Sequence, residues 1–168
     1  MKHRIVDKPA FEVLGWTLRT TTVGDENMRV IPQFWDRCLA DGKVEALEPL
    51  PGTFGVLGLC ADFDEKQQAF TYVIGVEAGP GGVPVPEGTQ RVKVPGATYA
   101  VFGCVGAMPD AIQNGWRTIM GQWLPTSGYE MERPVNFELY PTFPPGDERG
   151  DPASPKCYTE IWIPIKKK

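Results

Sequence analysis

Two short segments near the C-terminus combine a carboxylate with aromatic rings in the alternating pattern of a β-strand. The first is Phe137-Glu138-Leu139-Tyr140. Neighbouring side chains of a strand point to opposite faces, so Glu138 shares a face with Tyr140, and Phe137 shares the other with Leu139. We expect the apolar pair to pack on helices and Glu138 to point to the opposite face of the sheet.

The second segment repeats this pattern. Tyr158, Glu160 and Trp162 alternate with the apolar Ile161 and Ile163. We expect them to share the face of Glu138, so that two carboxylates lie among aromatic rings. An aromatic or ammonium cation would gain ion pairing from such a carboxylate and cation–π attraction from the rings. It would also offset the several kcal/mol that burying an unpaired carboxylate costs.

An ordinary structural role competes with this hypothesis. A glutamate on a strand is usually solvated or paired with Lys or Arg across the sheet. Both interpretations stay open for Glu138, and for Glu160 the ordinary role, solvated or paired, is favoured. Core packing is the simpler explanation for Trp35 and Trp116, because both lie at helical spacing among apolar residues.

Most other site chemistries lack their residues. His3 is the only histidine, Ser127 and Ser154 are the only serines, and the four cysteines include no C-x-x-C pair. A Ser-His-Asp or Cys-His catalytic site, or a metal site, is therefore not expected. No glycine-rich nucleotide-binding motif is present either. We expect neither metal nor cofactor.

Composition indicates one globular domain covering 1–168. The net charge of −4 and the absence of a basic stripe argue against direct nucleic-acid binding. No apolar run has the length of a signal or a membrane span. We expect a cytoplasmic protein with reduced cysteines.

The elements that must position these residues occur in the same order twice. Strands are predicted at 11–22, 54–61 and 69–77, then at 90–94, 97–106, 135–141 and 158–165, from alternating and β-branched patterns. Three- and four-residue apolar spacing predicts helices over 28–39, with Pro32 in the first turn, and from Pro109 to Trp123. The fold class is therefore α+β. Two β-α-β-β repeats, about 1–78 and 90–168, would form a curved antiparallel sheet with pseudo-twofold symmetry, two helices on one face and a ligand groove on the other.

Several segments resemble the GyrI-like and AraC-type effector-binding domain family. They are Phe70-Thr71-Tyr72-Val73-Ile74-Gly75, Val94-Pro95-Gly96-Ala97-Thr98-Tyr99-Ala100-Val101-Phe102, Trp123-Leu124-Pro125-Thr126-Ser127-Gly128-Tyr129-Glu130, and the two C-terminal segments above, extended to Pro141 and over 157–165. The resemblance covers nearly the whole chain in the right order. It implies a pocket between the repeats in which a buried glutamate, here Glu138, contacts cationic lipophilic drugs. It also implies that pocket-lining aromatic residues correspond to Trp35, Phe54, Tyr72 and Tyr158, with Trp116 as a further candidate.

Three functions follow as hypotheses. The first is sensing or sequestration of a cationic, aromatic small molecule. The second is hydrolysis of a reactive electrophile, with Glu138 as general base and Tyr72 or Tyr140 as donor. The third is binding to a protein such as gyrase. Regulators of the family carry a DNA-binding domain ahead of this module, whereas this chain begins at the module's own first strand, so we expect DNA contact only through a partner.

Overall fold

A computed structural model describes residues 2–48, 50, 55–79, 85–132 and 135–168. Its elements follow the predicted order, and the strands β1 and β7 are additions to it. The strands are β1 (His3–Lys8), β2 (Phe11–Thr21), β3 (Gly55–Asp64), β4 (Ala69–Glu77), β5 (Gln90–Val94), β6 (Ala97–Val105), β7 (Tyr129–Met131), β8 (Asn136–Pro141) and β9 (Tyr158–Lys167). The helical elements are η1 (Val23–Asp25), α1 (Glu26–Ala40), α2 (Asp110–Thr118), the π-helical η2 (Ile119–Trp123), α3 (Leu124–Thr126) and η3 (Glu148–Gly150).

The strands form one curved antiparallel sheet with an internal symmetry. Their order is β1-β6-β9-β8-β3-β4-β2-β5, and β7 pairs with β9 outside this path. The half β6-β9-β8 matches the half β2-β4-β3, and the two halves join at the central pair of β3 and β8. The outer strands are exchanged, because β1 pairs with β6 and β5 with β2. The predicted α+β fold and its pseudo-twofold arrangement are confirmed.

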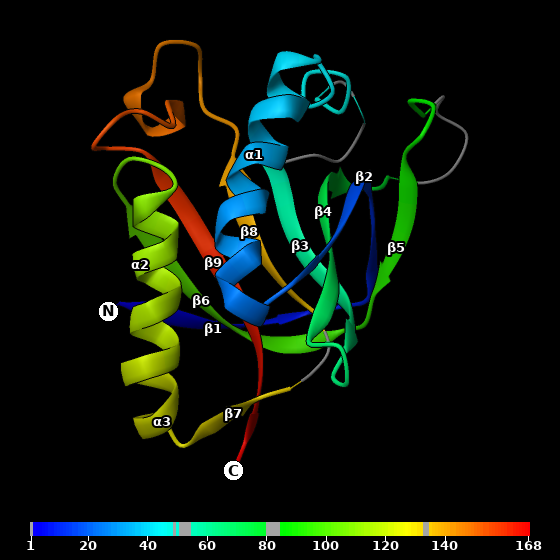
Figure 1. Ribbon diagram of the computed structural model, residues 1–168. Helices are drawn as coiled ribbons and strands as arrows, with labels where there is room; N and C mark the ends of the chain where they lie inside the picture. The colour runs from blue at the N-terminus through cyan, green and yellow to red at the C-terminus, as the bar shows by residue number, and fades with distance from the viewer. Residues whose placement is uncertain (1, 49, 51–54, 80–84, 133–134) are drawn as a thin grey trace.

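Both long helices lie on the same face of the sheet (Figure 1). On α1, Phe34 and Cys38 pack against side chains of β4. On α2 and η2, Ile112 and Ile119 pack against Phe102 and other residues of β6 and β9. The apolar stripes of the sequence therefore do what their spacing predicts, which is to bury one face of each helix.

Pro32 occupies the interior of α1, because the helix already begins at Glu26; its predicted place in the first turn is wrong. A proline cannot donate the backbone hydrogen bond to the carbonyl four residues earlier, which here belongs to Met28. That carbonyl accepts a long hydrogen bond, 3.5 Å, from the Gln113 amide of α2. The proline thus leaves an acceptor that links the two helices.

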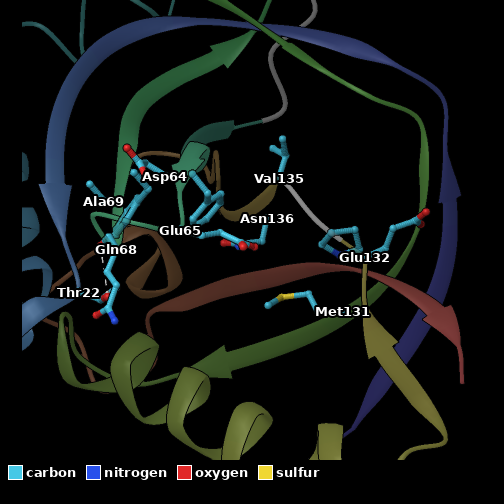
Figure 2. A pocket seen from close by; sticks show the side chains of 12 residues that line it. Thr22, Asp64, Glu65, Gln68, Ala69, Met131, Glu132, Val135 and Asn136 are labelled. Atoms are coloured by element: carbon cyan, nitrogen blue, oxygen red, sulfur yellow. Dashed lines mark hydrogen bonds between the residues drawn. The ribbon is translucent and has the colours of Figure 1, made fainter.

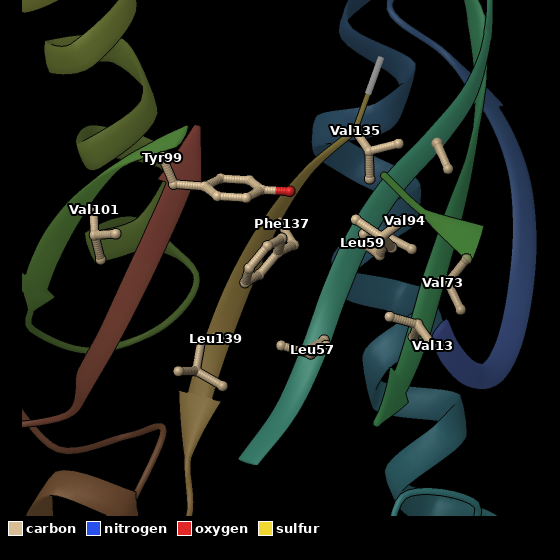
Figure 3. Packing of buried hydrophobic residues seen from close by; sticks show 11 residues of the cluster. Val13, Leu57, Leu59, Val73, Val94, Tyr99, Val101, Val135, Phe137 and Leu139 are labelled. Atoms are coloured by element: carbon tan, nitrogen blue, oxygen red, sulfur yellow. The ribbon is translucent and has the colours of Figure 1, made fainter. Parts of the chain in front are cut away.

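The face away from the helices holds a second apolar cluster (Figure 3). Phe137 and Leu139 lie in it, and the Phe137 ring stacks on Trp162 at 5.2 Å. Strand register explains this position: Glu138 is paired with Ile161, and Ile161 packs under α2. Directly paired residues share a face. The expectation that Phe137 and Leu139 pack on the helices is therefore wrong, and Glu138 faces the helices instead.

Candidate functional site

Glu138 lies in the middle of β8 and is only 9% exposed. Its carboxylate accepts three hydrogen bonds from neutral donors. Trp116 Nε1 donates to Oε1 at 2.7 Å, while the hydroxyls of Tyr72 and Tyr140 donate to Oε2 at 3.0 and 2.9 Å. The donors come from α2, β4 and β8, so the fold brings together groups far apart in the sequence.

Trp35 of α1 completes this arrangement. Its Nε1 donates to the Tyr72 hydroxyl at 3.0 Å, and its ring lies 4.8 Å from that of Tyr140. The rings of Trp35, Trp116 and Tyr140 are half-buried, whereas Tyr72 is fully buried. We call Glu138 and these four rings the Glu138 cluster. It lies between the two helices and the sheet. The rings of Trp35, Trp116 and Tyr140 are its partly exposed members.

Gly58 makes space for this cluster. It is paired with Glu138 across the seam between the two halves of the sheet. A Cβ atom at Gly58 would overlap the Tyr72 hydroxyl and would lie 2.9 Å from Glu138 Oε2. Glycine inside a strand often marks close approach of another group. That rule is the sequence signal that would have identified Gly58, which the sequence analysis missed.

The charge of Glu138 has no counter-ion among the described residues, because no Lys or Arg there forms an ion pair with it. Burial raises the pKa of this carboxyl above its ordinary value of 4.5, and the hydrogen bonds from Trp116, Tyr140 and Tyr72 only partly oppose that shift. Burial and the nearby carboxylate raise the pKa of Tyr72 and of Tyr140 well above 10, so both stay protonated donors. Within the described residues, the site is therefore a buried carboxyl group that accepts hydrogen bonds from neutral donors and has no basic partner.

Glu160 has the opposite environment, on the other face of the sheet, since it is paired with Leu139. Arg4 Nη2 lies 2.9 Å from both its carboxylate oxygens, and the guanidinium sits 5.6 Å above the Trp162 ring. Tyr158 and Trp162 also donate to Glu160, each at 2.9 Å. The prediction that Tyr158, Glu160 and Trp162 share a sheet face with Glu138 is wrong. Strand alternation and register direct the two carboxylates to opposite faces.

The structure thus gathers Glu138, Trp35, Tyr72, Trp116 and Tyr140, and separates Tyr158, Glu160 and Trp162 from them. Phe54 lies outside the described residues. The role of Arg4 was missed, because pairing of β1 with β6 is not visible in a local pattern. The predicted groove was expected on the face away from the helices. Glu138 faces the helices, so it does not lie on that face.

A hollow of about 490 Å³ opens beside the loop that joins β3 to β4 and the start of β8 (Figure 2). Phe63, Phe70, Met131 and Asn136 are among the residues that line it. Glu138 does not line it. Asn136, however, is the residue of β8 two positions before Glu138, and its side chain points to the same helix-facing side. Two residues of a strand span about 7 Å between their Cα atoms. The hollow therefore lies next to a β8 residue that shares the helix-facing side of the sheet with Glu138.

Other kinds of site find no support in the part of the chain that the structure describes. There, no group of three or more His, Cys, Asp or Glu side chains could hold a metal ion. All four cysteines are free thiols. None of the described helices is long and apolar enough to cross a membrane.

The sequence profile of the Cass2 family, integron-associated effector binding proteins, matches residues 4–165. The chain belongs to this family. Membership confirms the resemblance to GyrI-like effector-binding domains. The Cass2-family chain is 34% identical over 166 residues to the transcriptional regulator BrlR of Pseudomonas aeruginosa. That match covers 98% of the chain but only 56% of BrlR, so the chain spans just over half of the regulator's length.

Two solved structures share the fold of this Cass2-family protein. A transcription regulation protein from Staphylococcus aureus MU50 superposes with a TM-score of 0.79 at 23% identity, covering 99% of both chains. SAV2435 bound to tetraphenylphosphonium gives a TM-score of 0.81 at 24% identity, covering 99% of this chain and 94% of the other. At these identities the likeness establishes the architecture.

Proposed function

We propose that this Cass2-family protein binds a lipophilic, aromatic cation beside Glu138, between α1 and α2, as a sensor or a sequestering protein. The single observation on which this depends is the environment of Glu138: a buried carboxylate that accepts three hydrogen bonds from uncharged rings and has no basic partner in the described residues. Membership in an effector-binding family and the lipophilic cation bound to SAV2435 support it.

The physical argument is one of charge compensation. Burying an unpaired carboxylate costs several kcal/mol, and a cation placed against it recovers part of that free energy. The aromatic rings add cation–π attraction, about 0.5–2 kcal/mol for a well-placed ring. A neutral ligand of the same shape gains neither contribution, so the site should strongly favour cations.

The neighbouring space suits an aromatic ligand. Trp35, Trp116 and Tyr140 are half-buried, so part of the aromatic surface around Glu138 is accessible to solvent. The hollow that includes Asn136 has a volume typical of small-molecule sites, about 300–1,000 Å³. We propose that the charged centre lies against Glu138 while the aromatic groups extend toward this hollow.

A fluorescence titration with a rhodamine-type cationic dye tests the proposal. We expect micromolar affinity, about 8 kcal/mol. Glu138→Gln keeps the shape and removes the charge, and should weaken binding by at least about 1.5 kcal/mol, the low end for a charged partner.

The matched control is Glu130→Gln, which removes the same charge from an exposed residue paired with Lys166. It should leave dye affinity nearly unchanged. Equal affinity of the wild-type protein and Glu138→Gln would refute the proposed counter-ion.

A further inference from the structure

Two glutamates, Glu138 and Glu160, are buried in the described part of the chain, and they differ in how fully their acceptor positions are used. Each carboxylate oxygen offers about two lone-pair positions. At Glu160 all four are used, because each oxygen accepts one hydrogen bond from Arg4 and one from a ring, that of Tyr158 or Trp162. The fold therefore contains one example of a glutamate with a complete set of donors and a cation.

Glu138 has three donors in the described structure. Oε2 accepts from both Tyr72 and Tyr140, whereas Oε1 accepts only from Trp116. By comparison with Glu160, one acceptor position remains, on Oε1. The Glu138 carboxylate therefore favours a ligand with a full positive charge, but it can accept only one further hydrogen bond from that ligand.

We infer that Glu138 selects cations with at most one N–H donor, namely tertiary ammonium, quaternary ammonium and phosphonium ions, over primary ammonium ions. This inference rests on the proposed function and narrows its ligand class. A primary ammonium carries three N–H donors, and only one would find a position on the carboxylate. The other two N–H groups would lose their hydrogen bonds to water and face aromatic rings, which are weak hydrogen-bond acceptors. A quaternary centre has no such donors to satisfy and retains the charge pairing and cation–π attraction.

Tyr140 is the residue that we expect to set this selectivity. Its hydroxyl occupies the second position on Oε2, and the aromatic ring packs against Trp35 independently of that hydroxyl. Tyr140→Phe keeps the ring and frees an acceptor. It should therefore favour primary ammonium ions specifically. Tyr158→Phe is the matched control, because it removes the equivalent hydroxyl from Glu160 on the opposite face.

The test uses three ligands with one aromatic frame: naphthylmethylammonium and its N,N-dimethyl and N,N,N-trimethyl forms. Affinities are measured by calorimetry at neutral pH for the wild-type protein, Glu138→Gln, Tyr140→Phe and Tyr158→Phe. We expect the trimethyl and dimethyl ions to bind the wild-type protein about tenfold or more tightly than the primary ion, since each unsatisfied buried donor costs roughly that factor. Because methylation also adds apolar surface, the change of this ratio between variants decides the outcome.

Tyr140→Phe should lower the trimethyl-to-primary affinity ratio by about threefold or more, and Tyr158→Phe should leave it unchanged. A ratio that is the same in Tyr140→Phe as in the wild-type protein overturns the inference, as does a primary ion that binds as tightly as the trimethyl ion. If the trimethyl ion loses affinity in Glu138→Gln while these ratios stay constant, only the selectivity is wrong. If it binds wild type and Glu138→Gln equally, or does not bind, the proposed function fails with it.

Discussion

Glu138 should give this protein a distinctive dependence of stability on pH. The pKa of its carboxyl in the folded protein is raised above 4.5 by burial. The folded state therefore binds this proton more tightly than the unfolded chain does. The stabilisation that results is fully present below about pH 4.5 and is lost as pH rises through the folded-state pKa.

The magnitude follows from proton linkage. Between the unfolded and the folded pKa, the free energy of unfolding of the wild-type protein should fall relative to that of Glu138→Gln by about 1.4 kcal/mol per pH unit. Urea unfolding of both proteins at half-unit steps from pH 4 to pH 8 measures this difference. Other titrating groups are common to both proteins, so distant ones cancel.

Cation binding should show the opposite trend, because the ligand requires the ionised carboxylate. Affinity should drop about tenfold for each pH unit below the folded-state pKa and level off above it. In Glu138→Gln this dependence should disappear. A stability difference between the two proteins that stays constant across the whole pH range would refute the argument that burial governs this carboxyl.

Two further substitutions test the packing of the two glutamates. Gly58→Ala should push the Tyr72 hydroxyl aside, lower the unfolding free energy by about 1–3 kcal/mol and weaken dye binding. Urea unfolding and dye titration measure the two effects. In the control Gly121→Ala, whose Cβ would meet nothing within 4 Å, stability and dye affinity should not fall. Arg4→Ala leaves Glu160 buried without its cation and should cost about 1–3 kcal/mol, less than for a fully buried pair because the Arg4 side chain is 50% exposed. Adding Glu160→Gln should restore part of that loss in the same unfolding assay, and no recovery would argue against the ion pair as the cause.

Local patterns were sufficient for the two long helices, for the strands other than β1 and β7, and for relative side-chain direction. The apolar spacing that predicts α1 and α2, and the alternation that separates Glu138 and Tyr140 from Phe137 and Leu139, both follow from backbone geometry that every helix or strand shares. The close spacing of aromatic residues and a carboxylate in Phe137-Glu138-Leu139-Tyr140 is also evident from the sequence.

The sequence by itself therefore determined the order of the predicted elements, the doubled arrangement, and Glu138 as the candidate ligand-binding carboxylate. Tertiary structure decided which face each set of side chains occupies, because alternation specifies only that neighbours differ, while the register between distant strands specifies the face. Pairing of Glu138 with Ile161 turned it toward Trp116 and the helices, and pairing of Leu139 with Glu160 turned the second carboxylate toward Arg4. One glutamate thus has a cation supplied by the chain, and the other has only neutral donors in the described structure.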